Sequence, residues 1–407
     1  MRRHALALLL LATACAGGSG TATTAADPSA VSSLDPGSTS VSAPPTSDGS
    51  GSASTGSGSS TGTDDGSGSG TDTSTGAAAP DLPSEPAGAC RDLLAWSETE
   101  AFADDVHVSH PLPSFARAGF YYVHTMRQED ASERRLLFAA LGPDGAPGPW
   151  QEAAPDHGGG PHGYTAIVAD GQAYHFRNGH IAHYVFAADG TMVGDVELLE
   201  DSPDTAFGGN KYVWDTAVAM PLPMGHHVLH LGGFSFTGYT YRPDVYRSPV
   251  PLAASFSDTG LDHPSGQRPG KSVFYAPPGV AGGHVFTGRG DGPELWRGDI
   301  DPGGALLGWT QLPNLPDGTD NQRGDLFVAG RTLFTVRGAA VLRADLDLTG
   351  ELGAWTGVAS LPGPQVDMHW GEGHLEGAAY AVVDEHVYLT GPRRVYFAAL
   401  MGRPCDG

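Results

Sequence analysis

The chain has 407 residues and a formal net charge of −24, because 46 acidic residues outnumber 22 Lys and Arg. A general nucleic-acid-binding protein needs a basic face to neutralise phosphates, so this charge excludes that function class. The negative charge suits a soluble protein outside the cytoplasm, although charge informs solubility rather than fold.

The first fourteen residues are typical of a secretory signal. Arg2 and Arg3 form a positively charged start, and residues 5–11 form a short apolar stretch that small residues follow. This stretch is too short to span a bilayer, and no other stretch approaches the roughly 18 uninterrupted apolar residues of a membrane helix. The sequence therefore predicts a signal peptide at 1–14 and a soluble body.

Cys15 directly follows this signal, after the residues LATA. The arrangement resembles the lipobox of bacterial lipoproteins, in which signal peptidase cuts before a cysteine that then carries lipid. The resemblance implies that Cys15 anchors the mature chain to a membrane of the bacterial cell envelope. The protein would then be periplasmic or surface-exposed, with the lipid as its only membrane contact. The alternative is an ordinary signal peptide followed by an incidental cysteine.

Residues 15–89 begin with this cysteine, lead to the rest of the chain and are rich in Gly, Ser and Thr. Residues 16–88 contain no Lys or Arg and almost no large apolar side chains. Such a segment cannot bury enough apolar surface to offset the entropy of ordering it. We expect a disordered tether, with a root-mean-square span of roughly 45 Å for about 70 residues of Gly/Ser coil.

The predicted folded domain spans residues 90–407, where Trp, Tyr, Phe and Val occur in short runs between Gly, Pro and Asp. Helical periodicity is nearly absent. Many short strands between regular turns are typical of an all-β sandwich, barrel or propeller. Strands are predicted at 163–169, 227–231, 332–336, 378–383 and 386–390.

An internal repeat favours the propeller among these architectures. The segment LFAALGPDGAPGPW at 137–150 aligns without a gap with LRADLDLTGELGAW at 342–355, and WRGDIDPGGALLGW at 296–309 is a third copy. Each copy is a strand, a turn that uses a glycine, and a returning strand that a Trp opens. Two further strands precede each copy, so the repeating unit is a four-stranded propeller blade.

These units resemble kelch-type β-propeller repeats. The marks are the Gly232-Gly233 pair ending a second strand, an aromatic-rich third strand and a Trp opening the fourth. The resemblance implies a single propeller over 90–407. At about 50 residues per blade this gives about six blades, with five or seven as alternatives. The blades are expected to start near residues 110, 162, 212, 272, 325 and 376.

The two ends of the domain predict how the ring closes. The last unit stops after a third strand at 395–400, whereas residues 92–102 form a Trp-containing strand with no preceding partner. We expect this N-terminal strand to complete the last blade, which removes exposed sheet edges. Cys90 and Cys405 would then lie side by side, and export favours a disulfide between them. The alternative is two unrelated free thiols.

Polar residues in the connections that lead into the innermost strands form the candidate ligand face. These connections are expected to gather on one face around the central channel, and polar groups that converge beside an aromatic side chain are typical of a ligand site. The candidate residues are His157, His162, Lys211, Asp215, Asp320, Arg323, Asp367, His369, Trp370 and His374.

Histidine is frequent, with 17 in the chain, and groups occur at 157–162, 226–230 and 367–374. Imidazole with carboxylate serves metal binding or acid–base chemistry, but no group has the spacing of a zinc motif. His227 and His230 would point to opposite faces of one strand. No P-loop, dinucleotide fingerprint or Gly-x-Ser-x-Gly elbow is present, so the sequence predicts no cofactor and leaves a metal undecided.

The sequence thus favours a cell-envelope lipoprotein that displays its propeller as a non-catalytic module for a glycan, a peptide or an envelope protein. The alternative is a carbohydrate-active hydrolase, lyase or isomerase that uses His and carboxylate groups at the channel mouth. Glycosidase chemistry needs only a suitably spaced carboxylate pair. Both expectations rest on architecture, and fold alone does not determine function.

Overall fold

In the computed structural model of the chain, the described residues form strands and the turns between them. They are 90–103, 106–107, 114–127, 134–155, 163–177, 180–193, 197–199, 212–213, 216–235, 240–252, 256–266, 269–289, 292–316, 325–337, 340–362, 380–391 and 393–406. No helix occurs within these ranges, so they contain no membrane-spanning helix.

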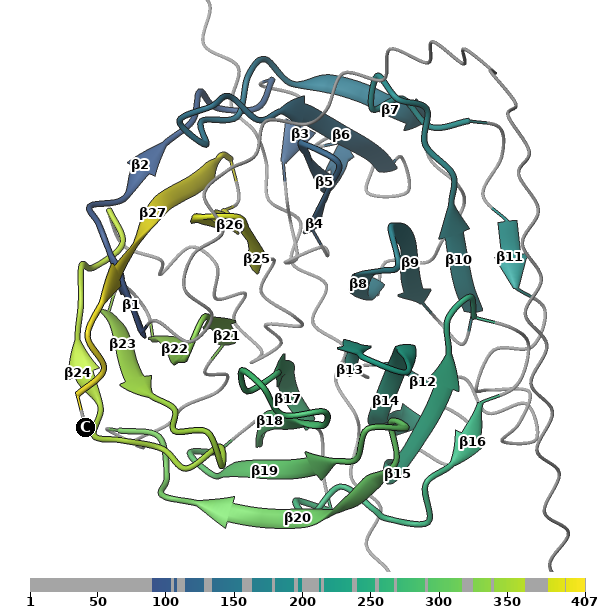
Figure 1. Ribbon diagram of the computed structural model, residues 1–407. Helices are drawn as coiled ribbons and strands as arrows, with labels where there is room; N and C mark the ends of the chain where they lie inside the picture. The colour runs from purple at the N-terminus through teal and green to yellow at the C-terminus, as the bar shows by residue number, and fades with distance from the viewer. Residues whose placement is uncertain are drawn as a thin grey trace, which may run out of the picture. The chain divides into compact units, whose positions relative to one another are not determined.

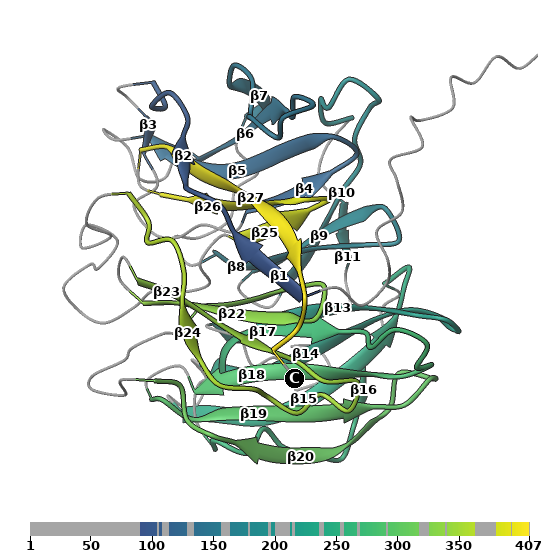
Figure 2. The same ribbon diagram turned by 60° about the vertical axis from the view of Figure 1, so that its left-hand side comes forward.

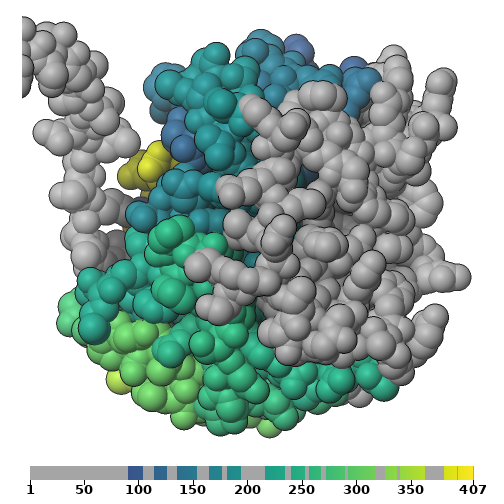
Figure 3. Space-filling model, turned by 90° about the vertical axis from the view of Figure 1, so that its right-hand side faces the viewer, coloured from purple at the N-terminus to yellow at the C-terminus, as the bar shows by residue number. Residues whose placement is uncertain are grey.

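The strands form six antiparallel sheets that follow one another around a ring, which is a six-bladed β-propeller (Figure 1). In the side view of Figure 3, colour passes from the blue of blade 1 at the top, through teal, to the green of blade 4 at the bottom. The predicted all-β propeller and its count of six blades are confirmed.

The blades have the following strands. Blade 1 has β3 (Val106–His107) with β4 (Ser114–Arg117), then β5 (Phe120–Arg127), β6 (Arg134–Ala140) and β7 (Gln151–Pro155). Blade 2 has β8 (Gly163–Ala169), β9 (Gln172–Arg177), β10 (His180–Tyr184) and β11 (Glu197–Leu199). Blade 3 has β12 (Tyr212–Val213) with β13 (Thr216–Leu222), then β14 (Gly225–Ser235), β15 (Thr240–Pro249) and β16 (Ser257–Asp258).

Blades 4 to 6 complete the ring. Blade 4 has β17 (Pro269–Tyr275), β18 (Gly283–Arg289), β19 (Leu295–Ile300) and β20 (Leu306–Leu312). Blade 5 has β21 (Asp325–Ala329), β22 (Thr332–Arg337), β23 (Ala340–Asp345) and β24 (Thr356–Gly357). Blade 6 has β25 (Tyr380–Val383), β26 (His386–Thr390), β27 (Val395–Arg403) and β1 (Cys90–Leu93) with β2 (Ser97–Glu98).

Apolar side chains fill the interface between each pair of neighbouring blades. Within the described residues there are six buried clusters, one for each interface of the ring. Between blades 1 and 2, for example, Phe115 and Phe138 both stack on Tyr122, and the ring of Phe186 lies 4.5 Å from that of Tyr122. Because strand residues alternate between the two faces of a sheet, each blade buries one face against the preceding blade and the other face against the following blade.

The turn between the third and fourth strands of a blade packs on the preceding blade. Tyr388 of blade 6 donates a hydrogen bond to the carbonyl of Gly145 in blade 1 (2.7 Å), and Tyr122 of blade 1 donates to Gly190 in blade 2 (3.0 Å). Gly145 has φ +76°, and a Cβ there would overlap the ring of His386. This is the glycine turn of the sequence repeat, and its glycine permits both the turn and the close approach.

The ring closes as predicted, because β1 and β2 both pair with β27 and complete blade 6. Cys90 lies opposite Arg403 at the start of β1, and its disulfide to Cys405 joins positions 315 residues apart. The other blades have a third-to-fourth turn at this place, so the disulfide replaces a turn that blade 6 lacks. Figure 2 shows β1 beside β27 near the C-terminus.

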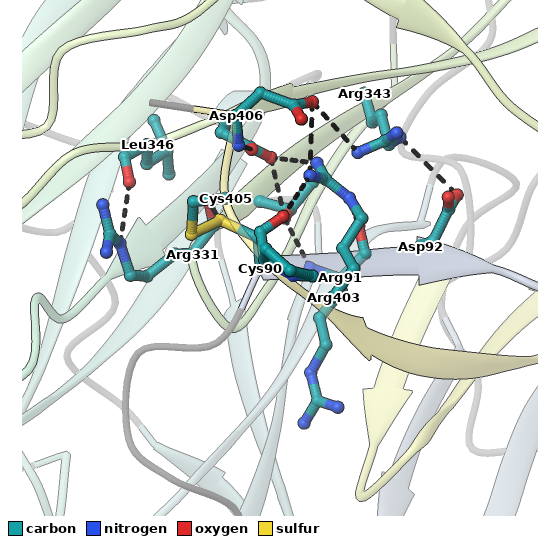
Figure 4. Close-up of polar contacts among 12 residues, drawn as sticks. Cys90, Arg91, Asp92, Arg331, Arg343, Leu346, Arg403, Cys405 and Asp406 are labelled. Carbon is teal, nitrogen blue, oxygen red and sulfur yellow. Dashed lines mark hydrogen bonds and ion pairs between the residues drawn. A yellow bond between two sulfur atoms is a disulfide. The ribbon is translucent and has the colours of Figure 1, made fainter.

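Charged groups surround the disulfide and connect blade 6 to blade 5 (Figure 4). Arg403 forms an ion pair with the buried carboxylate of Asp345, which also accepts a hydrogen bond from the backbone N–H of Asp406 (2.7 Å). The N–H of Arg91 donates to the hydroxyl of Thr332 (2.8 Å). These bonds satisfy polar groups that the closing strand brings into the interface.

One sequence expectation about a strand end is wrong. The Gly232-Gly233 pair does not end a second strand, because β14 continues to Ser235 and pairs there with β15. The pair instead lies at a shift in register, and a Cβ on Gly232 would overlap the carbonyl oxygen of Arg242. Glycine permits a positive φ both at a β-bulge and in the turn that ends a strand, so the sequence alone does not distinguish the two.

The disulfide should contribute strongly to stability. Replacing both Cys90 and Cys405 with Ala should lower the free energy of unfolding by about 5 kcal/mol, because the unfolded chain regains the freedom of a very long loop. Calorimetry on the oxidised protein and on the double variant measures the difference. Equal melting temperatures for the two proteins would contradict this role.

The turn glycine should also be sensitive to substitution. Gly145→Ala should cost about 2–3 kcal/mol, because the new methyl group meets the His386 ring in a buried contact. Gly171→Ala is the matched control, since Gly171 also has positive φ but nothing lies within 4 Å of its Cβ position. There only backbone strain of about 1 kcal/mol is expected. Urea unfolding measures both, and equal losses would refute the packing argument.

Candidate functional site

The predicted ligand-face residues all lie outside the described residues. His157 and His162 precede β8, Lys211 and Asp215 flank β12, Asp320 and Arg323 precede β21, and Asp367, His369, Trp370 and His374 precede β25. The structure describes the strands to which these connections lead, and these strands determine at which end of the ring the connections lie.

The innermost strands of the six blades surround the axis of the ring (Figure 1). Successive blades repeat by rotation about this axis, so the first residues of β4, β8, β13, β17, β21 and β25 belong to one end of the ring. We call this end the top face. The tight turns that connect the first and second strands, such as Gly119 and Gly171, belong to the opposite end.

The innermost strands offer little chemistry of their own. Among those of their side chains that the structure describes, none is a carboxylate or an imidazole, and the one charged group is Arg117. Arg117 ends β4 at the face opposite the top, where its Nε donates to the carbonyl of Gly171 (2.6 Å). The described side chains of the innermost strands therefore bring no carboxylate or imidazole to the top face, and two further charged residues, Lys271 and Asp325, belong to these strands by sequence.

A buried layer of hydroxyl groups lies beneath the top face between blades 6 and 1. The hydroxyl of Tyr121 lies 2.6 Å from that of Ser114 and 3.0 Å from that of Thr390. Burial raises the pKa of Tyr121 to about 12, although these two hydrogen bonds act in the opposite direction. The phenol therefore stays neutral at physiological pH and connects the start of β4 to the end of β26.

A histidine performs the corresponding task between blades 3 and 4. The Nδ1 of His263 accepts a hydrogen bond from the backbone N–H of Ser265 (3.3 Å), so this nitrogen carries no proton. Nε2 then donates to the hydroxyl of Thr287 (3.3 Å), which also accepts from Ser272 on β17 (2.9 Å). Burial lowers the pKa of His263 to about 3, so the imidazole is neutral.

These interactions identify His263 as an anchor of the connection into blade 4, which sequence reasoning missed. The sequence gives no signal for this role, because His263 lies in none of the histidine groups at 157–162, 226–230 and 367–374. Its signal is three-dimensional, because its partners on β17 and β18 come from elsewhere in the chain.

The histidine group at 226–230 behaves as predicted on its strand. His227 and His230 lie on β14, where His230 is buried beside Phe176 of blade 2. His227 packs instead against Gly304 of blade 4. The two imidazoles therefore point to opposite faces and do not form one site.

Among the described residues, one group of three His, Cys, Asp or Glu side chains lies close enough together to hold a metal ion: Cys90, Cys405 and Asp345. Its two sulfur atoms are bonded to each other, and the carboxylate pairs with Arg403. A disulfide offers no thiolate to a metal. The group therefore closes the ring and is not a metal centre in this oxidised state.

No protein-family model matches the sequence, and the search of curated proteins found no relative. The chain is similar to a solved gluconolactonase from Xanthomonas campestris (14% identity, covering 77% of this chain and 100% of that one, TM-score 0.41). It is also similar to the PQQ domain of pyranose dehydrogenase from Coprinopsis cinerea (8% identity, 76% and 97%, TM-score 0.45). At this level of similarity only the fold is in common, and no activity follows.

The neutral His263 makes a pH-dependent contribution to stability. The unfolded imidazole binds a proton near pH 6.5, whereas the folded one stays neutral down to about pH 3. Between these values the unfolded state holds more protons, so stability is lost as the pH falls. Urea unfolding at pH 7 and pH 4.5 should show the wild type losing more stability than His263→Gln, and parallel losses would contradict the assignment.

Proposed function

We propose that the protein is an exported lipoprotein, anchored through Cys15, whose kelch-type propeller binds a ligand at its top face without transforming it. The disulfide supports export, because Cys90–Cys405 needs an oxidising compartment to form and persist. A signal-like N-terminus and a lipobox-like Cys15 are consistent with the same route. The Gly/Ser-rich residues before Cys90 would hold the propeller away from the membrane.

The top face is the proposed binding surface because the connections that lead to it are rich in candidate ligand-binding residues. The described side chains of the innermost strands are mostly apolar, with Arg117 at the opposite end, whereas four of the connections into these strands carry all ten candidate residues. Trp370 lies in the longest of these connections, with Asp367, His369 and His374 close to it in sequence. An aromatic ring beside hydrogen-bonding groups suits a sugar ring, so a glycan is the first ligand class to test.

Binding to an array of bacterial envelope glycans tests this function. Wild-type protein should bind a subset of the array, and Trp370→Ala and Asp367→Asn should each weaken binding tenfold or more. Asp384→Asn is the matched control, because it removes the same charge from an exposed turn at the opposite end, where its φ of 49° also suits Asn.

Two outcomes would overturn the proposal. Equal binding by all variants would remove the top face as the site. Cleavage or conversion of a bound glycan, followed by mass spectrometry, would replace the binding module with the alternative of a carbohydrate-active enzyme. In that case loss of turnover in Asp367→Asn, with binding retained, would identify a catalytic carboxylate.

A further inference from the structure

Two imidazoles and a phenol converge on one point between blades 1 and 2. The hydroxyl of Tyr184 on β10 lies 3.2 Å from Nε2 of His124 on β5 and 3.0 Å from Nδ1 of His175 on β9. The two imidazole rings lie 4.5 Å apart. His175 and Tyr184 are buried, and His124 is partly exposed. Three strands thus bring three nitrogen or oxygen donors together.

The register of the strands explains this convergence. Tyr184 pairs with Ala173, and His175 lies two residues further along β9, so the two side chains are diagonal neighbours on one face of blade 2. That face packs against blade 1, where His124 follows two residues after Tyr122 on the same side of β5. The donors therefore meet in the interface between blades 1 and 2.

The propeller repeat provides an internal control for these histidines. His175 is the fourth paired residue of β9, counted from the hairpin that connects the first and second strands of its blade. The residues at the same place in the other blades are Val123, Val228, Thr287, Thr335 and Leu389. At the place of His124 they have Phe176, Leu229, Gly288, Val336 and Thr390. At each of the two positions, five of the six blades fold without an imidazole, so the fold does not require one there.

We propose that His124, His175 and Tyr184 bind a divalent transition-metal ion of the zinc and copper class. Imidazole nitrogen is the protein ligand that these ions prefer, with bond lengths of about 2.0–2.1 Å. Donors at that distance from one tetrahedral ion lie roughly 3.3 Å apart by this geometry. The donor separations of 3.0 and 3.2 Å therefore need little adjustment to accept an ion.

Ion binding would replace the hydrogen bonds that the three groups now share. The phenol proton of Tyr184 would leave to solvent as the oxygen bonds the ion, so binding should weaken as the pH falls. Affinity should be higher for Cu²⁺ than for Zn²⁺, as for other nitrogen and oxygen sites. None of these three residues is among the ten candidate residues of the top face, so loss of the ion and loss of glycan binding can be told apart.

Metal titration of the mature protein, after treatment with a chelator, tests the proposal. Native mass spectrometry and calorimetry with ZnCl₂ and CuCl₂ should show an ion bound by the wild type that His175→Gln and Tyr184→Phe lose or bind at least 100-fold more weakly. Tyr184→Phe keeps the packed ring and should also lack the visible phenolate-to-copper absorption of the wild type.

His183→Gln is the matched control, because His183 precedes Tyr184 on β10 but bonds Gln172 (2.7 Å) and stacks on Tyr174. This variant should bind the ion as the wild type does. The proposal is overturned if the wild type binds no ion. It is also overturned if a folded His124→Gln/His175→Gln double variant keeps the wild-type stoichiometry and affinity, since the ions would then lie elsewhere.

Discussion

Each blade in this ring has two apolar faces, and only a neighbouring blade covers either of them. The six interblade clusters are therefore mutually dependent, and one open interface would expose apolar side chains on both of its sides. Closure by β1 and β2 is the step that covers the last face, and the Cys90–Cys405 disulfide fixes it at the first paired residue of β1. The pairing of β1 with β27 and the disulfide beside it thus keep the ring closed.

The two ends of the ring differ in how much of their structure the repeat dictates. At the face opposite the top, short hairpins and glycine turns pack on the preceding blade through recurring contacts such as Tyr388 with Gly145. Beneath the top face, different buried groups serve different interfaces: a tyrosine hydroxyl between blades 6 and 1, and a neutral histidine between blades 3 and 4. Function in a repeat fold is expected where the repeat is broken, and these groups support connections of unequal length and composition.

Sequence reasoning predicted the architecture well because the repeat is local. The glycine turn and the Trp that follows lie within fourteen residues of each other, so the pattern is visible along the chain. The disulfide was also predictable, because the domain has only two cysteines and both lie beside strands that lack partners. The bulge at Gly232 was not, since a glycine pair fits a strand end and a bulge equally well.

The interblade contacts could not be predicted in this way. His124 and His175 are 51 positions apart, and only the register of two sheets places them on facing surfaces. The ion pair of Arg403 with Asp345 likewise depends on the fold, because it joins the closing strand to another blade. The candidate ligand-face residues remain a prediction from the repeat, and the variants at 367 and 370 are their test.

We propose that the ring closes through Cys90 and Cys405 on export, and that a lipid on Cys15 anchors the chain to the membrane. Intact-mass analysis of the protein extracted from its native membrane, alkylated before and after reduction, tests this most directly. We expect a lipid adduct on Cys15, with Cys90 and Cys405 labelled only after reduction. A chain without lipid, whose two domain cysteines are alkylated before reduction, would contradict it.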